Sequence, residues 1–405
     1  MQGHYRRSRP HKAASAGLLL VLSLTVSPAV FPQSDSASAA PLDQQIAASL
    51  ARGDRGHAAD LLNQLLAEPR LASDLLERAG IAFAEKGLYS EASRAFERSV
   101  RDYPSLFEGY YNLALAELGL DRLPQALKVI EEAPHRSEEE STARLYLRGK
   151  IEASLGQMQS AGQDLAAAFE KAPGQENYAL DLGLVDLRAH AYPQAERVFA
   201  RGSDLNPQSP YLGLGLALAQ FLGGRTSQSV ESARRLLAAA PDFSPARLLL
   251  GFTLYFDGNL DGAREVAQEG LKRGTPDPYL YYLDAAILQK QHVREYARIL
   301  ADLSVAEKNI PGCALCYVAS GRSHEEQSDL PAALSDFQKA VQFAPDLSEG
   351  WYHLASVSER MGKTTEAAQA RAHFQQMKEN LDEREKEIMR GVFLQSLGAQ
   401  GSTGP

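Results

Sequence analysis

Two stretches far apart in the chain share one pattern. They are AGIAFAEKGLYSEASRAFERSVRDYP (residues 79–104) and SGRSHEEQSDLPAALSDFQKAVQFAP (residues 320–345). Identical residues stand at corresponding positions, namely Gly80 and Gly321, Ala92 and Ala333, Phe96 and Phe337, and Pro104 and Pro345. A pattern that returns so far along the chain indicates an internal repeat, and a repeat determines the architecture before any single motif does.

The repeat has a period of 34 residues and continues beyond residue 40. Gly or Ala recurs at position 8, Gly at position 15, Ala at position 20 and Pro at position 32. The unit from Leu280 matches worst, because Ile287 and Arg294 replace small residues and two residues are extra. We place the unit starts near Ala39, Ser73, Phe107, Thr142, Glu176, Pro210, Ser244, Leu280, Ala314 and Ser348.

The residue types at these positions favour a pair of helices in each unit. Gly and Ala at positions 8 and 20 let two helices approach closely, and Gly at position 15 accommodates the turn between them. Pro at position 32 ends the second helix, because it lacks an amide hydrogen and clashes with the preceding turn. One such pair cannot bury its own apolar face, so consecutive pairs must stack.

The whole pattern resembles the tetratricopeptide repeat over nearly all of the chain after the first forty residues. The resemblance implies an all-α, right-handed superhelical solenoid of about ten helix-turn-helix units, in which the first helix of each unit lines the concave side. It also implies a protein-binding scaffold without catalytic activity. We expect the array at residues 42–377, a charged capping helix at 378–395 and a disordered tail at 396–405.

The N-terminal segment has the order of a secretory signal. A basic stretch with Arg6 and Arg7 precedes an apolar run from Ala16 to Val26, and small residues follow. This order predicts a signal peptide at residues 1–33, with cleavage between 29 and 39, and a linker at 34–41. An uncleaved signal anchor is the alternative. We therefore expect an exported protein, periplasmic or envelope-associated in a bacterium, or secreted.

The charge of the chain argues against one class of partner. The formal net charge is −9, and without the basic N-terminal segment 38 basic residues face 51 acidic ones. Such a surface repels phosphate backbones, so nucleic-acid binding is not expected. No segment after the signal is long and apolar enough to span a membrane. The sequence leaves the identity of the partner and the oligomeric state open.

The only two cysteines, Cys313 and Cys316, lie at the start of a predicted first helix. Tyr317 stands where haem attachment needs a histidine, and a second cysteine pair for zinc is missing. Residues three apart on a helix lie within reach of a disulfide. Three interpretations remain, namely two small buried side chains, a local disulfide, or a redox-active pair.

In the tetratricopeptide family, ligands usually lie against positions 2, 5, 9 and 12 of the first helices. The resemblance therefore implies a partner-binding groove formed by Tyr111, Leu115, Tyr146, Lys150, Leu184, Tyr211, Leu218, Phe221, Phe252, Tyr255 and Tyr281. Tyrosines supply rigid contact area to a peptide or protein partner. The alternative is that a tightly wound array packs these side chains against each other.

Motifs of catalysis are missing from the sequence. It contains no H-E-x-x-H metal-binding pattern, no phosphate-binding loop and no G-x-S-x-G nucleophile motif. We therefore expect no enzymatic activity, no cofactor and no metal. Two alternatives to a scaffold remain, an accessory subunit of an envelope enzyme or secretion system, and a redox-active envelope protein using Cys313 and Cys316.

Overall fold

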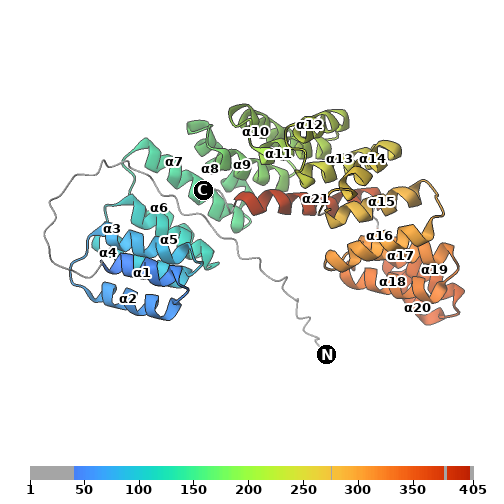
Figure 1. Cartoon of the computed structure of the whole chain (residues 1–405), viewed down its shortest axis with the longest axis horizontal. Coiled ribbons are helices and arrows are strands. Elements are labelled where there is room, and N and C mark those ends of the chain that lie inside the picture. Colours follow the sequence, from blue (N-terminus) through green and yellow to red (C-terminus); the bar gives the residue numbers. More distant parts are fainter. Residues whose placement is uncertain (1–40, 275, 378–380, 402–405) are drawn as a thin grey trace. The chain divides into compact units, whose positions relative to one another are not determined.

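The structure is a computed structural model that describes residues 41–274, 276–377 and 381–401. Over these residues the chain forms twenty-one α-helices and no strand (Figure 1). Twenty of the helices follow one another as ten pairs, which confirms the predicted all-α array of about ten helix-turn-helix units. The predicted signal peptide and most of the linker lie outside the described residues.

The first helix of each pair is called an A helix below. The A helices are α1 (Leu42–Ala51), α3 (Ser73–Ala84), α5 (Phe107–Gly119), α7 (Glu138–Ser154), α9 (Glu176–Arg188), α11 (Pro210–Leu222), α13 (Ser244–Phe256), α15 (Pro278–Lys290), α17 (Ala314–Glu326) and α19 (Ser348–Arg360).

The second helix of each pair is called a B helix. The B helices are α2 (Arg55–Ala67), α4 (Tyr89–Asp102), α6 (Leu123–Glu132), α8 (Met158–Lys171), α10 (Tyr192–Leu205), α12 (Thr226–Ala239), α14 (Leu260–Leu271), α16 (Tyr296–Asn309), α18 (Leu330–Phe343) and α20 (Thr364–Gln376). One further helix, α21 (Leu381–Gly401), follows the last pair.

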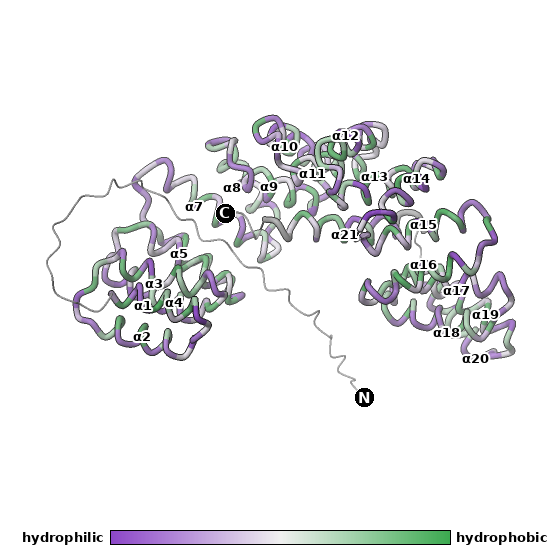
Figure 2. The backbone as a smooth tube through the Cα atoms, in the orientation of Figure 1, coloured by the Kyte–Doolittle hydropathy of each residue, from purple (hydrophilic) through white to green (hydrophobic). Residues whose placement is uncertain are grey.

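Contacts in the array are made between neighbours. Helix α3 packs on α4, α4 packs on α5, and the consecutive A helices α3 and α5 also touch. The contacts divide the chain into two compact parts, which are larger than the helix-pair repeats and are called unit 1 and unit 2 below. Unit 1 contains α1 to α9, and unit 2 runs from α10 to Leu397 of α21. Hydrophobic and hydrophilic residues alternate along the helices (Figure 2), as expected when each helix buries one face between its neighbours.

The small residue at position 8 is required by a phenylalanine on the B helix. A Cβ atom added to Gly80 would lie 2.4 Å from Cε1 of Phe96. The same contact recurs between Gly321 and Phe337 at 2.7 Å. Both rings are fully buried, so they have no room to move aside. The spacing of glycine and phenylalanine in the sequence therefore encodes the close approach of these two helix pairs.

The turn between the two helices of each pair contains one residue with positive φ. Glycine supplies it six times, and an Asp, two His and a Ser supply it four times. In chain order they are Gly53, Gly87, Asp121, Gly156, His190, Gly224, Gly258, His292, Ser328 and Gly362. Glycine adopts this conformation without steric cost, whereas the other residue types adopt it less readily. Every one of the ten units thus keeps the same turn.

These turns correct the register of the eighth unit. The turn residue is His292, whereas a unit starting at Leu280 would place it at Arg294. The unit therefore starts two residues earlier, at Pro278, where α15 begins. The carboxylate of Asp277 caps this helix by accepting a hydrogen bond from the amide of Tyr279 at 2.9 Å. The two extra residues consequently lie after the turn.

The C-terminal helix differs from its prediction in length and in place. Helix α21 continues to Gly401, so residues 396–401 of the predicted disordered tail are helical. It contacts α15, the end of α13 and Asp346 in the loop before the final pair, rather than the final pair alone as a cap would. Leu397 is buried and extends the apolar stripe of the helix, which explains why it does not end at residue 395.

Candidate interaction surface

The A helices of unit 2 present a row of aromatic side chains. Phe252 on α13 is fully buried, and its ring centroid lies 6.2 Å from that of Tyr282 on α15 and 6.4 Å from that of Tyr255. Tyr255 and Tyr282 keep 8% and 5% of their surface exposed. We call the surface formed by Tyr255, Phe256, Tyr282, Ala286 and Lys290 the A-helix face of unit 2.

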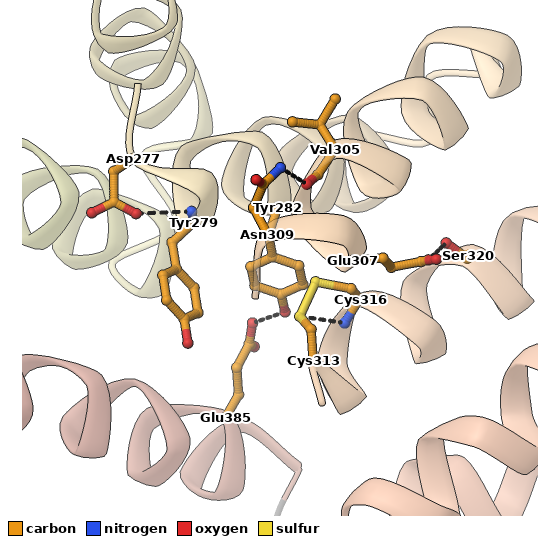
Figure 3. The surroundings of a disulfide bond; sticks show 10 residues. All are labelled: Asp277, Tyr279, Tyr282, Val305, Glu307, Asn309, Cys313, Cys316, Ser320 and Glu385. Carbon is orange, nitrogen blue, oxygen red and sulfur yellow. Dashed lines mark hydrogen bonds between the residues drawn. A yellow bond between two sulfur atoms is a disulfide. The ribbon is translucent and has the colours of Figure 1, made fainter. Parts of the chain in front are cut away.

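Helix α21 lies against this face. The hydroxyl of Tyr282 donates a hydrogen bond to Oε1 of Glu385 at 2.7 Å (Figure 3). The Nζ of Lys386 lies 5.7 Å from the centre of the Phe256 ring. Arg384 forms an ion pair with Asp346, in the loop between α18 and α19. Three consecutive residues of α21 therefore fix its position by polar and cation–π contacts.

Burial determines the protonation state of the tyrosine in this contact. It raises the pKa of Tyr282 well above its ordinary value, and the neighbouring Glu385 carboxylate raises it further. The phenol therefore keeps its proton near neutral pH and donates it to the carboxylate. A hydrogen bond to a charged acceptor contributes about 1.5–3 kcal/mol, so Glu385 is a specific anchor of α21.

A pocket of about 250 Å³ remains open beside this contact. Its wall includes the aromatic rings of Tyr255 and Tyr282 and the carboxylate of Glu385. It also includes two cationic side chains. Lys290 lies over the Tyr255 ring at 4.3 Å, and Arg322 pairs with Glu349 at 3.3 Å. Helix α21 thus fills the A-helix face of unit 2 only in part.

Unit 1 carries a different arrangement on its A helices. The rings of Tyr146 and Tyr178 stack with centroids 4.2 Å apart. The Tyr146 hydroxyl donates to Oδ2 of Asp181 at 2.6 Å and accepts a hydrogen bond from the Asn177 amide at 3.2 Å. Lys150 completes the network with an ion pair to Asp181 at 3.2 Å. These groups satisfy one another, so the network holds α7 and α9 together.

The tyrosines of this network are kept neutral. Burial raises the pKa of Tyr178 to about 12, and it raises the pKa of Tyr146 well above its ordinary value. The Asp181 carboxylate adds to the shift of Tyr146. Tyr111, on α5, is buried nearby and its pKa is raised for the same reason. None of these groups is set up to lose a proton near neutral pH.

A larger hollow of unit 1, about 460 Å³, lies between α4, α5 and α6. The buried carboxylate on its wall, Glu117, already accepts a hydrogen bond from Ser93 at 2.6 Å and pairs with Arg122 at 3.4 Å. Its wall combines apolar side chains such as Val100 with charged ones such as Glu97 and Lys128.

The structure buries most of the residues predicted to form the groove. Lys150, Tyr211 and Tyr281 are partly exposed. The buried ones are Tyr111, Leu115, Tyr146, Leu184, Leu218, Phe221, Phe252 and Tyr255. Phe252 in particular packs inside the array, whereas Tyr255 lines the open pocket.

One residue of the face was missed by the sequence analysis. Tyr282 contacts α21, but the register placed Tyr281 in the groove instead. With the unit starting at Pro278, Tyr282 falls at position 5, the position that Tyr111 and Tyr146 hold in their units. The pair Asp277-Pro278 was the available signal, because Ser209-Pro210 begins another A helix in the same way.

Cys313 and Cys316 are joined by a disulfide at the start of α17 (Figure 3). Their Cα atoms are 5.3 Å apart, and Cys313 also caps the helix by accepting a hydrogen bond from the Cys316 amide. Cys316 is fully buried and Cys313 is 7% exposed. Thiol exchange needs access to a sulfur atom, so this geometry favours a structural bond over a redox-active one.

No group of three or more His, Cys, Asp or Glu side chains within the residues that the structure describes is arranged to hold a metal ion. Among the described helices, none combines the length and the apolar character that crossing a membrane requires.

Comparison with known proteins agrees with the ten helix pairs. A family model described as a tetratricopeptide repeat matches residues 78–141 and 180–242. The chain is a tetratricopeptide repeat protein. The first matched region runs from within α3 to the start of α7, and the second runs from within α9 to just after α12.

Two curated proteins resemble parts of this tetratricopeptide array. Tetratricopeptide repeat protein 8 of Caenorhabditis elegans is 25% identical over 227 residues, which cover 56% of this chain and 43% of that protein. Superkiller complex protein 3 of Mus musculus is 32% identical over 104 residues, which cover 26% of this chain and 7% of that protein. The chain thus spans less than half the length of either relative.

Two solved structures are similar to parts of the chain at lower sequence identity. A tetratricopeptide repeat protein from Parabacteroides merdae has a TM-score of 0.48 and 19% identity, covering 62% of this chain and 98% of that one. The Cut9–Hcn1 hetero-tetramer of APC/C includes a chain with a TM-score of 0.47 and 12% identity, covering 88% of this chain and 96% of that one.

Proposed function

We propose that this protein is an exported, non-catalytic scaffold that binds a protein partner through the A-helix face of unit 2. The observation that carries the proposal is that a helix, α21, already sits on this face while a pocket of about 250 Å³ stays open beside it. Tyrosines and a lysine line the face, and such side chains supply large contact area with a polar end.

The shape of the repeat supports a binding role on general grounds. Stacked helix pairs form extended surfaces, and repeat proteins use these surfaces for recognition.

The proposal of export rests on the basic, apolar and small-residue order of the N-terminal segment alone. N-terminal sequencing of the protein recovered from its cells tests it. A new N-terminus within residues 30–40 is expected, and a retained Met1 would contradict cleavage.

The binding face can be tested by reversing its charge. Lys290 is exposed and Arg322 is partly exposed, and both line the pocket, so a Lys290→Glu, Arg322→Glu variant changes the face without opening the core. The matched control is Lys272→Glu, Arg234→Glu, which makes the same charge change at two exposed residues of unit 2 away from the pocket. Circular dichroism confirms that each variant is folded.

The assay is a crosslinking pull-down from an extract of the cells that make the protein. We expect the parent and the control variant to capture the same partner and the pocket variant to lose it. Capture of that partner by all three proteins would place recognition on another surface and refute the proposed site.

A further inference from the structure

Helix α21 stands apart from the repeat pattern of the array. The ten pairs end at Gln376, and within the described residues no second helix pairs with α21. It lies instead on α15 and the end of α13, several helices before it in the chain. It therefore occupies the A-helix face of unit 2 as a ligand helix would, although it belongs to the same chain.

The contacting side of α21 is one stripe of four residues. Glu385, Met389, Phe393 and Leu397 are spaced four apart, so they share one face of the helix. Met389, Phe393 and Leu397 are fully buried, and Glu385 binds the Tyr282 hydroxyl. Gly391 and Gln395, on other sides of the helix, are exposed. The side of α21 that the array buries therefore carries an acidic residue, which contacts Tyr282, followed by three large apolar residues.

The fit between α21 and the face is incomplete. The pocket beside Glu385 stays open, and the exposed Lys290 lies on its wall. Arg384 and Asp346 pair near the surface, with 62% of the Asp346 side chain exposed, and exposed pairs of this kind contribute little to stability. A helix with an additional acidic side chain would reach Lys290 and fill space that α21 leaves empty.

We propose that the A-helix face of unit 2 binds an amphipathic helix of another protein, with an acidic residue followed by apolar residues four and eight positions later. Helix α21 is the internal occupant that this helix displaces. The inference rests on the proposed scaffold function and adds to it the chemistry of the partner. Displacement requires only that the partner bind the open face more favourably than α21 does.

The test uses a fluorescent peptide with the sequence of residues 384–397, REKEIMRGVFLQSL, as the helix that enters from outside. Fluorescence polarisation measures its binding to the full chain and to two variants. Phe393→Asp places a charge on the buried stripe and expels α21, whereas Gln395→Asp places the same charge on an exposed position of the same helix.

We expect the peptide to bind Phe393→Asp at least tenfold more tightly than it binds the parent or Gln395→Asp. A peptide with Glu385→Ala should bind about tenfold less tightly, because it loses the hydrogen bond to Tyr282. A Glu387→Ala peptide is the control, since Glu387 pairs with Arg390 of α21 itself at 2.7 Å. Equal binding to all three proteins, or no binding to Phe393→Asp, would overturn the proposal.

Two further measurements keep the proposal testable. If Phe393→Asp fails to fold, amide hydrogen exchange on the unmodified chain decides, because a displaceable helix opens without the rest of the array. Exchange in α21 at least tenfold faster than in α13 and α15 supports the proposal, and equal protection refutes it. Size-exclusion chromatography with light scattering tests whether a second copy of this chain fills the face instead. A dimer of Phe393→Asp would show that it does.

The two proposals fail in distinguishable ways. If the peptide enters the face but the pocket variant still captures the partner, the helix site stands and the proposed function of this face does not. If the pocket variant loses the partner but the peptide never enters, the face binds a partner that does not resemble α21, and the inference made here is overturned.

Discussion

The close approach of α3 and α4 makes a sharp prediction for Gly80. Alanine at this position would place its Cβ 2.4 Å from Cε1 and 2.6 Å from Cζ of Phe96, a ring with no exposed surface. Such overpacking costs about 1–3 kcal/mol. Alanine also stabilises the middle of a helix by about 1 kcal/mol relative to glycine, which offsets part of that cost.

A second glycine separates these two effects. Gly162 lies inside α8, and a Cβ there would meet only Cγ1 of Val185, at an ordinary 3.9 Å. Gly162→Ala should therefore gain helix propensity without overpacking. We expect the free energy of unfolding of Gly80→Ala to fall about 1–3 kcal/mol below that of Gly162→Ala, and the contact distance places it near the upper end.

The assay must report on unit 1, because repeat arrays do not always unfold in a single step. Urea titration followed by circular dichroism gives the overall change, and native-state hydrogen exchange of α3 and α4 gives the local one. Phe96→Leu in the Gly80→Ala background should recover part of the loss, so the double-mutant cycle should show favourable coupling. Equal stability of Gly80→Ala and Gly162→Ala would refute the close-approach argument.

Two further predictions concern unit 2. Burial, together with the nearby Asp284 carboxylate, raises the pKa of Asp302 to about 6. Because the folded state favours the protonated form, stability is greatest below about pH 4 and falls as the pH rises through about 6, by at most about 3 kcal/mol. Solvent reduces this limit, since 19% of the side chain is exposed. Asp302→Asn should make the urea midpoint depend less on pH between pH 4 and 7. Asp204→Asn, a change at an exposed aspartate, should leave that dependence as it is. For Cys313 and Cys316, thiol titration of the denatured chain should find no free thiol without reductant and two with it. Changing both to Ser should cost no more than about 2 kcal/mol, because the closed loop is short. Two free thiols without reductant would contradict the bond.

The repeat architecture was predictable because a few positions encode it directly. Gly80 and Phe96 recur as Gly321 and Phe337, and the structure shows that each glycine makes room for its phenylalanine. The turns between the helices could be predicted only in part from the sequence. Asp121, His190, His292 and Ser328 adopt the positive φ that glycine supplies elsewhere, and a pattern based on glycine does not find them. This is why the eighth unit was placed two residues too late and Tyr282 was missed.

The position of α21 could not be predicted from the residues alone. An amphipathic sequence shows that a helix has a face to bury, but it does not identify the surface that receives it. The anchor is a contact between Glu385 and Tyr282, 103 residues apart in the chain, and nothing in either local sequence indicates the other. The same limit applies to the groove residues, because position in the repeat does not reveal whether a side chain such as Phe252 is covered.

The covalent attachment of α21 sets a threshold for whatever competes with it. A helix carried on the same chain meets its site at an effective concentration on the order of millimolar, whatever the dilution of the protein. A free helix of equal intrinsic affinity would therefore need a similar concentration to take its place. Only a partner with additional contacts, or one presented in many copies, could compete at lower concentrations. The tether thus makes the face selective against weak, chance encounters with exposed helices.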